Sequence, residues 1–195
     1  MNIFFILFIF CSVLSNTTSY HAYKNDDDIK CPGSKAYFNA GCKMRIYFEE
    51  DCDIVYHEIV TERIANKNWI DPHNQGVYKI IEQSFKSFLL LSRDTGTGSW
   101  KKYNDKIALT FLNHNSNTFD NNIGDDIHST VNHHNRGCNI QACSESQSNS
   151  ILDHSTNYCN IHDLYCNDKE CQPHSNLHYT EEFIKCNQHH LDSCY

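Results

Sequence analysis

The segment from Cys159 to Cys166 contains the residue types best suited to chemistry. Its sequence is Cys-Asn-Ile-His-Asp-Leu-Tyr-Cys, so His162 and Asp163 lie side by side between two cysteines. An imidazole can act as a general base near neutral pH, and a carboxylate can hold a divalent cation. These two residues are the candidate catalytic pair of a small hydrolase. We favour the alternative of a disulfide-tied helix that carries both residues as polar surface groups.

The same segment resembles the active-site helix of the secreted phospholipases A2. That family has a C-C-x-x-H-D-x-C string, and the resemblance implies that His162 activates water and Asp163 binds calcium. This chain departs from the pattern, because Tyr158 replaces the first cysteine and Cys166 comes one residue late. The Gly-rich calcium loop of the family also has no counterpart upstream, although the cation stabilises the oxyanion in such a reaction.

A second candidate site lies in the sequence Asp-Pro-His-Asn at residues 71–74. Asp71 and His73 are two residues apart, and together they could hold a divalent metal ion. Both side chains can equally close a turn by hydrogen bonding to its backbone, and we favour this interpretation. Pro72 and the later Gly76 also indicate a turn. We expect no cofactor.

Cysteines give the clearest statement about the fold. The chain has 11 cysteines, and Cys11 lies in a segment that we expect to be removed, which leaves ten. An even set in an oxidising compartment is usually fully paired, and the absence of a C-x-x-C pair argues against zinc. The predicted disulfide cysteines are Cys31, Cys42, Cys52, Cys138, Cys143, Cys159, Cys166, Cys171, Cys186 and Cys194. Three of them precede the long cysteine-free region and seven follow it, so at least one bond must cross it.

The N-terminal residues predict export. Residues 3–14 are almost wholly apolar, a length that suits a signal peptide and is too short for a membrane span. Val13 and Ser15 suit cleavage before Asn16, so we assign residues 1–15 to a signal peptide and expect no transmembrane span after its removal. We interpret the polar residues 16–30 as a flexible lead-in to a single disulfide-rich domain at residues 31–195.

Several segments show the periodicity of regular elements. Alternation predicts a strand at residues 43–48, and a 3.6-residue pattern predicts a helix at residues 52–64. Three further strands are expected at 77–83, 87–92 and 106–112, with a Gly-containing turn at 94–99 between the second and the third. We also expect a short helix or turn within 155–166 and a helix at 180–187, with Thr180 as its N-cap. The Asn- and His-rich residues 113–136 predict a disordered insertion. The expected fold is α+β: a helix packed on a three- to four-stranded antiparallel sheet, with disulfides that tie its ends.

Five strings together are similar to small secreted cysteine-rich proteins of protists and algae that have no assigned function. They are DPHNQGVY at 71–78, SRDTG at 92–96, YNDK at 103–106, CSESQ at 143–147 and DHSTNYCN at 153–160, followed by LYC at 164–166. The resemblance implies a secreted α+β module and assigns no catalytic residue.

The net charge of −8 argues against nucleic acid as a partner, because phosphates attract basic surfaces. We expect a non-enzymatic binding or structural protein that is secreted or surface-released, or that resides in the lumen of the secretory pathway. Its partner would be an extracellular or luminal protein or glycan. The alternative is the small hydrolase that uses His162 and Asp163.

Overall fold

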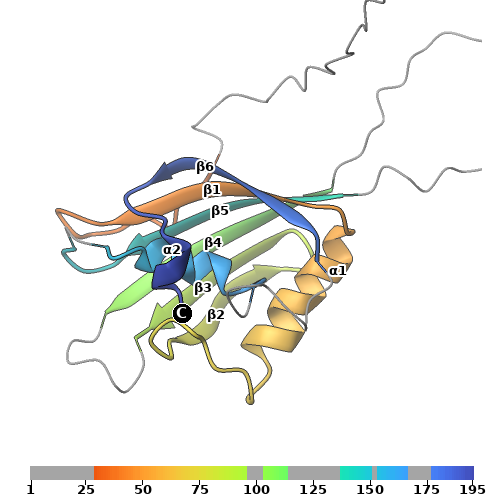
Figure 1. Cartoon of the computed structure of the whole chain (residues 1–195), viewed down its shortest axis with the longest axis horizontal. Coiled ribbons are helices and arrows are strands. Elements are labelled where there is room, and N and C mark those ends of the chain that lie inside the picture. The colour runs from red at the N-terminus through yellow and green to blue at the C-terminus, as the bar shows by residue number, and fades with distance from the viewer. Residues whose placement is uncertain (1–28, 96–102, 114–136, 151–152, 167–176) are drawn as a thin grey trace, which may run out of the picture.

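The protein is built around one antiparallel sheet of six strands (Figure 1). The computed structural model describes residues 29–95, 103–113, 137–150, 153–166 and 177–195. The strands are β1 (Gly41–Phe48), β2 (Val77–Ser84), β3 (Phe88–Asp94), β4 (Asn104–Asn113), β5 (Cys138–Ser146) and β6 (Tyr179–Cys186). Their order across the sheet is β2-β3-β4-β5-β1-β6, so the first strand in the chain pairs with the last two.

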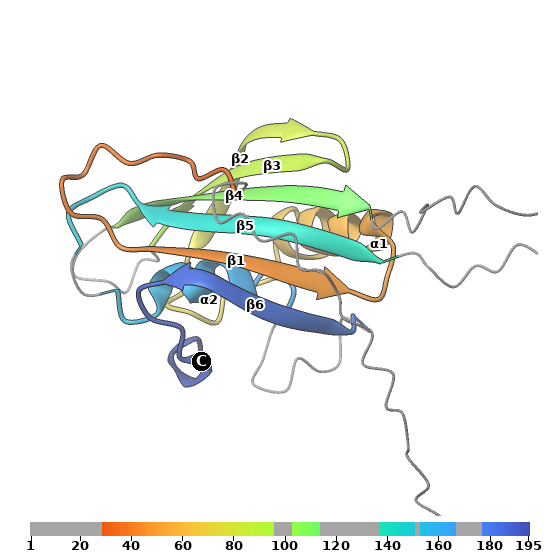
Figure 2. The same cartoon turned by 90° about the horizontal axis from the view of Figure 1, so that it is seen from above.

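The helices cover one face of this sheet, and Figure 2 shows them beneath the strands. Helix α1 (Cys52–His57) continues into a π-helical stretch, η2 (Glu58–Ile64), and packs against β4 and β5. Helix α2 (Thr156–His162) packs mainly on β5, and a short 3-10 helix, η3 (Leu191–Ser193), contacts α2. The covered face therefore holds the core, and its central row includes Leu89, Leu109, Ala142 and Met44.

Our predicted fold class is wrong in its proportions. The sheet has six strands instead of three or four, and it dominates a fold whose helices are short. The error comes from the C-terminal third of the chain. The segment of β5 was not recognised as a strand, because its inward positions include Cys138, Ser144 and Ser146 besides Ile140. The segment predicted as a helix at 180–187 is strand β6.

The other elements agree with their predictions. The four predicted strands correspond to β1, β2, β3 and β4, and the predicted helix at 52–64 corresponds to α1 with η2. The short helix expected within 155–166 is α2. Residues 71–76 form the predicted turn, in which the backbone N–H of Gln75 donates to the carbonyl oxygen of Asp71.

Disulfide bonds connect the N-terminal part of the chain to the strands that follow the cysteine-free region. Cys31 is bonded to Cys143, Cys42 to Cys186 and Cys52 to Cys138, and a fourth bond joins Cys159 to Cys194. Cys166 is also disulfide-bonded, whereas Cys171 lies outside the described residues. Three of these bonds cross the cysteine-free region, which confirms the prediction that at least one bond does so. The bonds do not only staple the ends, because β1, β5 and β6 themselves carry cysteines.

The predicted signal peptide, most of the lead-in and the predicted insertion at 113–136 lie outside the described residues, except that Asn113 ends β4. Within the described part of the chain, no helix combines the length and apolar character needed to span a membrane.

Candidate functional site

The turn at residues 71–76 is organised around a buried ion pair. The Asp71 carboxylate accepts hydrogen bonds from the backbone N–H groups of His73 (3.0 Å) and Gly76 (2.9 Å), and from Nε of Arg93 on β3 (2.9 Å). Arg93 Nη2 also donates to Asp71 and to the backbone oxygen of His73. A methyl group at position 76 would collide with the guanidinium, so the chain needs Gly76 for this close approach.

Asp163 joins this ion pair from the end of α2. Its carboxyl group is fully buried and lies close to that of Asp71. Burial, followed by the negative charge of Asp71, raises the pKa of Asp163 to about 10. Asp163 is therefore protonated and neutral at neutral pH. The single positive charge of Arg93 is then balanced by Asp71 alone.

A layer of hydrogen-bonded polar side chains lies between α2 and the sheet. Asn160 donates to Asp105 Oδ2 on β4 (2.9 Å) and to Ser144 Oγ on β5 (3.2 Å). One turn earlier on α2, Asn157 donates through Nδ2 to Asp153 Oδ1 (2.7 Å) and to the hydroxyl oxygen of Ser146 (3.2 Å). All these side chains are buried. This layer fixes the positions of Asp105 and Asp153.

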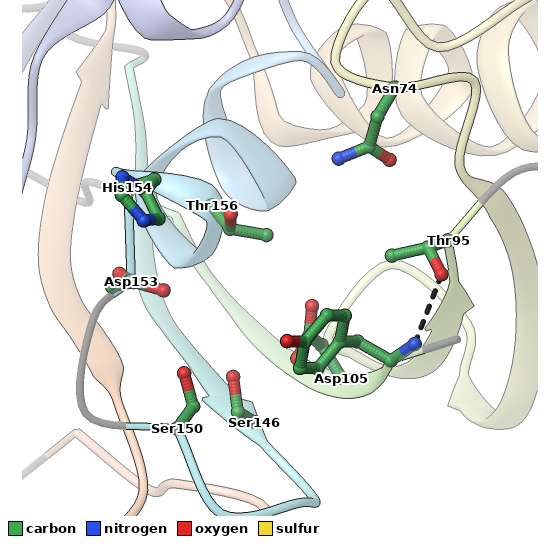
Figure 3. Close-up of a pocket in the computed structure, with 9 residues that line it drawn as sticks. Asn74, Thr95, Asp105, Ser146, Ser150, Asp153, His154 and Thr156 are labelled. Atoms are coloured by element: carbon green, nitrogen blue, oxygen red, sulfur yellow. Dashed lines mark hydrogen bonds between the residues drawn. The ribbon is translucent and has the colours of Figure 1, made fainter. Parts of the chain in front are cut away.

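These two carboxyl groups line a polar cavity of about 140 Å³ at one end of the sheet. Figure 3 shows Asp153, His154 and Thr156 on one side of it, Asn74 and Thr95 on the other, and Ser146 and Ser150 near its base. The lining residues are Asn74, Thr95, Tyr103, Asp105, Ser146, Ser150, Asp153, His154 and Thr156. None of these described lining residues is aliphatic, and none is a lysine or an arginine.

Asp105 is a lining residue that is buried and has one carboxylate oxygen without a partner. Its side chain is only 1% exposed, and its Oδ2 is held by Asn160, whereas its Oδ1 is buried with no hydrogen-bond partner. A buried carboxylate oxygen without a partner costs free energy, and such groups are rare in folded proteins. Asp105 therefore brings to the cavity wall a buried acceptor that no described protein group uses.

The surroundings of Asp153 shift its pKa. Burial raises the pKa of Asp153 to about 6, and the negative charge of Asp105 adds to this effect, against the hydrogen bonds from Asn157. At neutral pH most molecules carry a negative charge on Asp153. The cavity then presents two carboxylates that repel each other, and a cation between them would relieve this repulsion.

The backbone around the cavity is also unusual. Five described residues other than glycine have positive φ angles, and four of them form two adjacent pairs that flank the cavity: Asn74, Gln75, His154 and Ser155. Side chains disfavour this conformation, and strained residues of this kind concentrate at functional sites. Ser155 is held there from outside, because its hydroxyl oxygen accepts a hydrogen bond from the backbone N–H of His190 (2.9 Å).

The candidate catalytic residues His162 and Asp163 point to different surroundings. His162 Nδ1 contacts Glu181 Oε1 on β6 (2.8 Å), whereas Asp163 contacts Asp71. Both side chains are buried, with 2% and 0% exposure, so their expected placement on a helix surface is wrong. His162 Nε2 is buried without a hydrogen-bond partner. Neither residue lines the cavity.

The weak metal candidates Asp71 and His73 share the turn, but their donor atoms bind protein groups. His73 Nδ1 lies 2.8 Å from the backbone oxygen of Ser193, and its Nε2 lies 3.3 Å from Thr156 Oγ1. Burial and the positive charge of Arg93 lower the pKa of His73, which favours the neutral ring. A separate cluster of possible ligands contains Cys31, Cys143 and Glu145, but its two sulfurs form a disulfide bond.

The structure brings together all five sequence strings quoted above. The turn supplies Asn74, β3 ends at the cavity with Thr95 after it, and β4, β5 and α2 contribute Asp105, Ser146 and Thr156. Their sequence patterns alone do not indicate a site. Asp105 and Asp153 were missed as functional residues, because a lone aspartate in a strand or turn carries no spacing signal.

In comparisons with known proteins, no family model, no curated protein and no solved structure matches this chain. The resemblance to protist and algal cysteine-rich proteins stays a prediction.

Proposed function

We propose that this chain is a non-enzymatic binding protein and that its ligand is a small polar molecule bound in the cavity beside α2. The observation that carries the proposal is the buried and unpartnered Oδ1 of Asp105 at a cavity with a polar lining. Binding sites place a few convergent polar groups in a concave, largely preformed pocket. The polar layer under α2 provides such preorganisation, because it fixes Asp105 before a ligand arrives.

The size of the cavity limits the ligand. An engineered protein cavity of about 150 Å³ is large enough for benzene, so about 140 Å³ suits a ligand or ligand fragment of about six non-hydrogen atoms. The polar lining favours a molecule with several hydroxyl, amine or amide groups. A whole protein or a long glycan would have to present such a fragment.

An NMR titration of the oxidised protein tests this proposal. The probes are glycerol, 3-aminopropane-1,2-diol and glycerate, which are similar in size and differ in charge. We expect at least one of them to shift the backbone amide signals of Thr95, Asp105, Ser146 and Thr156 in a saturable way. Saturable shifts confined to other regions, or none with any of the three probes, would contradict the proposal.

The disulfide bonds support a location outside the cytoplasm, because such bonds persist in oxidising compartments. We therefore propose that the protein is secreted or resides in the lumen of the secretory pathway. Expression of the full chain in eukaryotic cells, followed by fractionation and N-terminal sequencing, tests both export and cleavage before Asn16. Recovery of the chain with residues 1–15 in the cytosol would contradict this location.

The hydrolase with His162 and Asp163 remains the second candidate. One observation favours it: Glu181 binds His162 Nδ1 and leaves Nε2 without a partner, as in an oriented general base. Against it, the imidazole is buried, and Asp163 faces Asp71 instead of the same site. Phospholipase or esterase activity that is lost in His162→Gln would support this candidate, whereas activity that survives the substitution would exclude it.

A further inference from the structure

The charges around the cavity define the ligand more narrowly, on the basis of the proposed function. We propose that the ligand carries an ammonium group, which donates a hydrogen bond to the free Oδ1 of Asp105. The ligand class is a small hydroxylated alkylamine. Its hydroxyl groups would meet the hydroxyl and amide side chains of the cavity wall, among them Thr95, Ser146 and Asn74 (Figure 3).

The first argument is charge balance. Arg93 is a buried cation that contacts Asn74 of the cavity wall, and its charge is taken up by Asp71, to which it donates through Nε and Nη2. Asp163 stays neutral because its pKa is raised to about 10. Asp105 and Asp153 therefore remain without a contacting cation, although Arg93 is close enough to interact with Asp105 through space. A ligand with one positive charge would offset part of the negative charge of these two carboxylates.

The second argument is the hydrogen-bonding capacity of the site. An ammonium group has three donors and no acceptor, so it needs converging oxygen atoms. Asp105 Oδ1 offers a charged acceptor that no protein group uses. Hydroxyl oxygens of the wall can accept as well as donate. An anionic ligand would instead meet two carboxylates.

The third argument separates an organic amine from a metal ion. Calcium takes six to eight oxygen ligands and usually several carboxylates. Here Asp105 Oδ2 is bound to Asn160, and the Asp153 carboxylate accepts from the backbone N–H and Nδ2 of Asn157. In the described part of the chain, Asp105 and Asp153 do not belong to any group of three close metal-ligating side chains. One free carboxylate oxygen suits a single ammonium group better than a divalent ion.

The test compares 3-aminopropane-1,2-diol with glycerol, which has the same number of non-hydrogen atoms but a hydroxyl group in place of the ammonium. Both are titrated into the labelled oxidised protein at pH 7.5, and calcium chloride is titrated separately. We expect the amine to bind in the millimolar range, since six-atom ligands have few contacts. Its affinity should exceed that of glycerol by about 10-fold or more, because hydrogen bonds to charged groups are the stronger ones.

Asp105→Asn should reduce amine affinity by about 10-fold or more and leave glycerol affinity nearly unchanged. The matched control is Asp53→Asn, which removes the same charge from an exposed position on α1, where Asp53 pairs with Lys86. This control should bind the amine as the wild type does. If Asp105→Asn does not fold, the comparison of amine with glycerol on the wild type still decides.

The outcomes separate this inference from the proposed function. Equal binding of glycerol and the amine at the cavity would overturn the ammonium inference and leave a polar-ligand site in place. Calcium that shifts the same signals at lower concentration than the amine would overturn it in favour of a metal site. Failure of every probe, glycerate included, would overturn the inference and the proposed function together.

Discussion

At the scale of single residues, buried aspartates behave differently according to their partners. Asp163 is neutral because burial and the neighbouring carboxylate of Asp71 raise its pKa to about 10, whereas Asp153 is ionised at neutral pH with a pKa raised to about 6. Asp105 lines the cavity and has one buried oxygen without a hydrogen-bond partner. None of these differences follows from residue type, because each depends on neighbours that the fold brings from other elements.

Asp153 predicts a pH dependence of stability. A carboxyl group with a raised pKa binds its proton more tightly in the folded state, so stability falls as pH rises from about 4 to about 6. One pKa unit corresponds to about 1.4 kcal/mol. Raising the pKa from 3.8 to about 6 lowers the free energy of unfolding at neutral pH by at most about 3 kcal/mol.

Urea unfolding between pH 4 and pH 7 measures this effect in the wild type and in Asp153→Asn. We expect the wild type to lose stability relative to the variant over this range, because asparagine carries no charge that burial could penalise. Asp53→Asn serves as the control and should follow the wild-type curve, since its side chain is exposed. A difference between wild type and Asp153→Asn that stays constant with pH would contradict the expectation.

At the scale of elements, β6 places two adjacent glutamates on opposite faces of the sheet. Glu181 points under α2, where it accepts hydrogen bonds from Tyr158 (3.1 Å), Tyr165 (2.5 Å) and the imidazole of His162 (2.8 Å). Burial alone would raise the pKa of Glu181, but the hydrogen bonds from these three rings hold it below its ordinary value. Glu182 faces the other side, where it contacts Arg45 and Tyr47.

Alanine substitutions at these two positions test the strand. We expect Glu181→Ala to reduce the free energy of unfolding by about 3 to 5 kcal/mol, because it leaves several buried donors without an acceptor. Glu182→Ala should cost about 1 kcal/mol or less, since its ion pair is partly exposed. Chemical denaturation measures both. Similar losses for the two variants would mean that β6 does not alternate as described.

The same element shows where sequence patterns stop being informative. Strands β1 and β4 were predictable because apolar residues alternate with polar ones along them, as at Ile107, Leu109 and Phe111. Strands β2 and β3 were predictable as short apolar runs beside turns. In β6 the pattern Thr-Glu-Glu is typical of a helix start, and the strand forms because β1 offers it an edge to pair with. That edge lies more than 130 residues earlier in the chain, and a local pattern cannot report it.

The cavity was less predictable than the sheet. Its residues come from five separate strings, and only the antiparallel register places Arg93, Asp105 and Ser146 in one row of the covered face. The adjacent residues His162 and Asp163 were the candidate catalytic pair in the sequence. In the structure, His162 contacts Glu181, whereas Asp163 lies close to Asp71. Two residues that are adjacent in the sequence therefore need not share a site, because the fold decides which neighbours each side chain meets.

At the scale of the whole molecule, disulfides hold together segments that are distant in sequence. Three of the described bonds span 112, 144 and 86 residues, and they join the N-terminal third to β5 and β6. The fourth, Cys159–Cys194, closes 35 residues and ties the C-terminus to α2. Loop-closure entropy assigns about 4 kcal/mol to a loop of this length, within the range of 2 to 5 kcal/mol measured for native disulfides.

The Cys159–Cys194 bond gives the last prediction. It lies beside two contacts that brace the cavity, His190 with Ser155 and Ser193 with His73. Replacing both cysteines by alanine should lower the free energy of unfolding by about 2 to 4 kcal/mol. It should also weaken binding of 3-aminopropane-1,2-diol, because the C-terminal segment no longer fixes Ser155 in its left-handed conformation.

The matched control is the double variant Cys52→Ala with Cys138→Ala. This bond joins the start of α1 to the start of β5, and neither cysteine lines the cavity. We expect it to reduce stability without changing amine affinity when the protein is kept folded. Titration and urea unfolding of both double variants separate the two effects. If both lose affinity alike, the cavity depends on global stability; if only the Cys159–Cys194 variant does, the C-terminal segment positions the site.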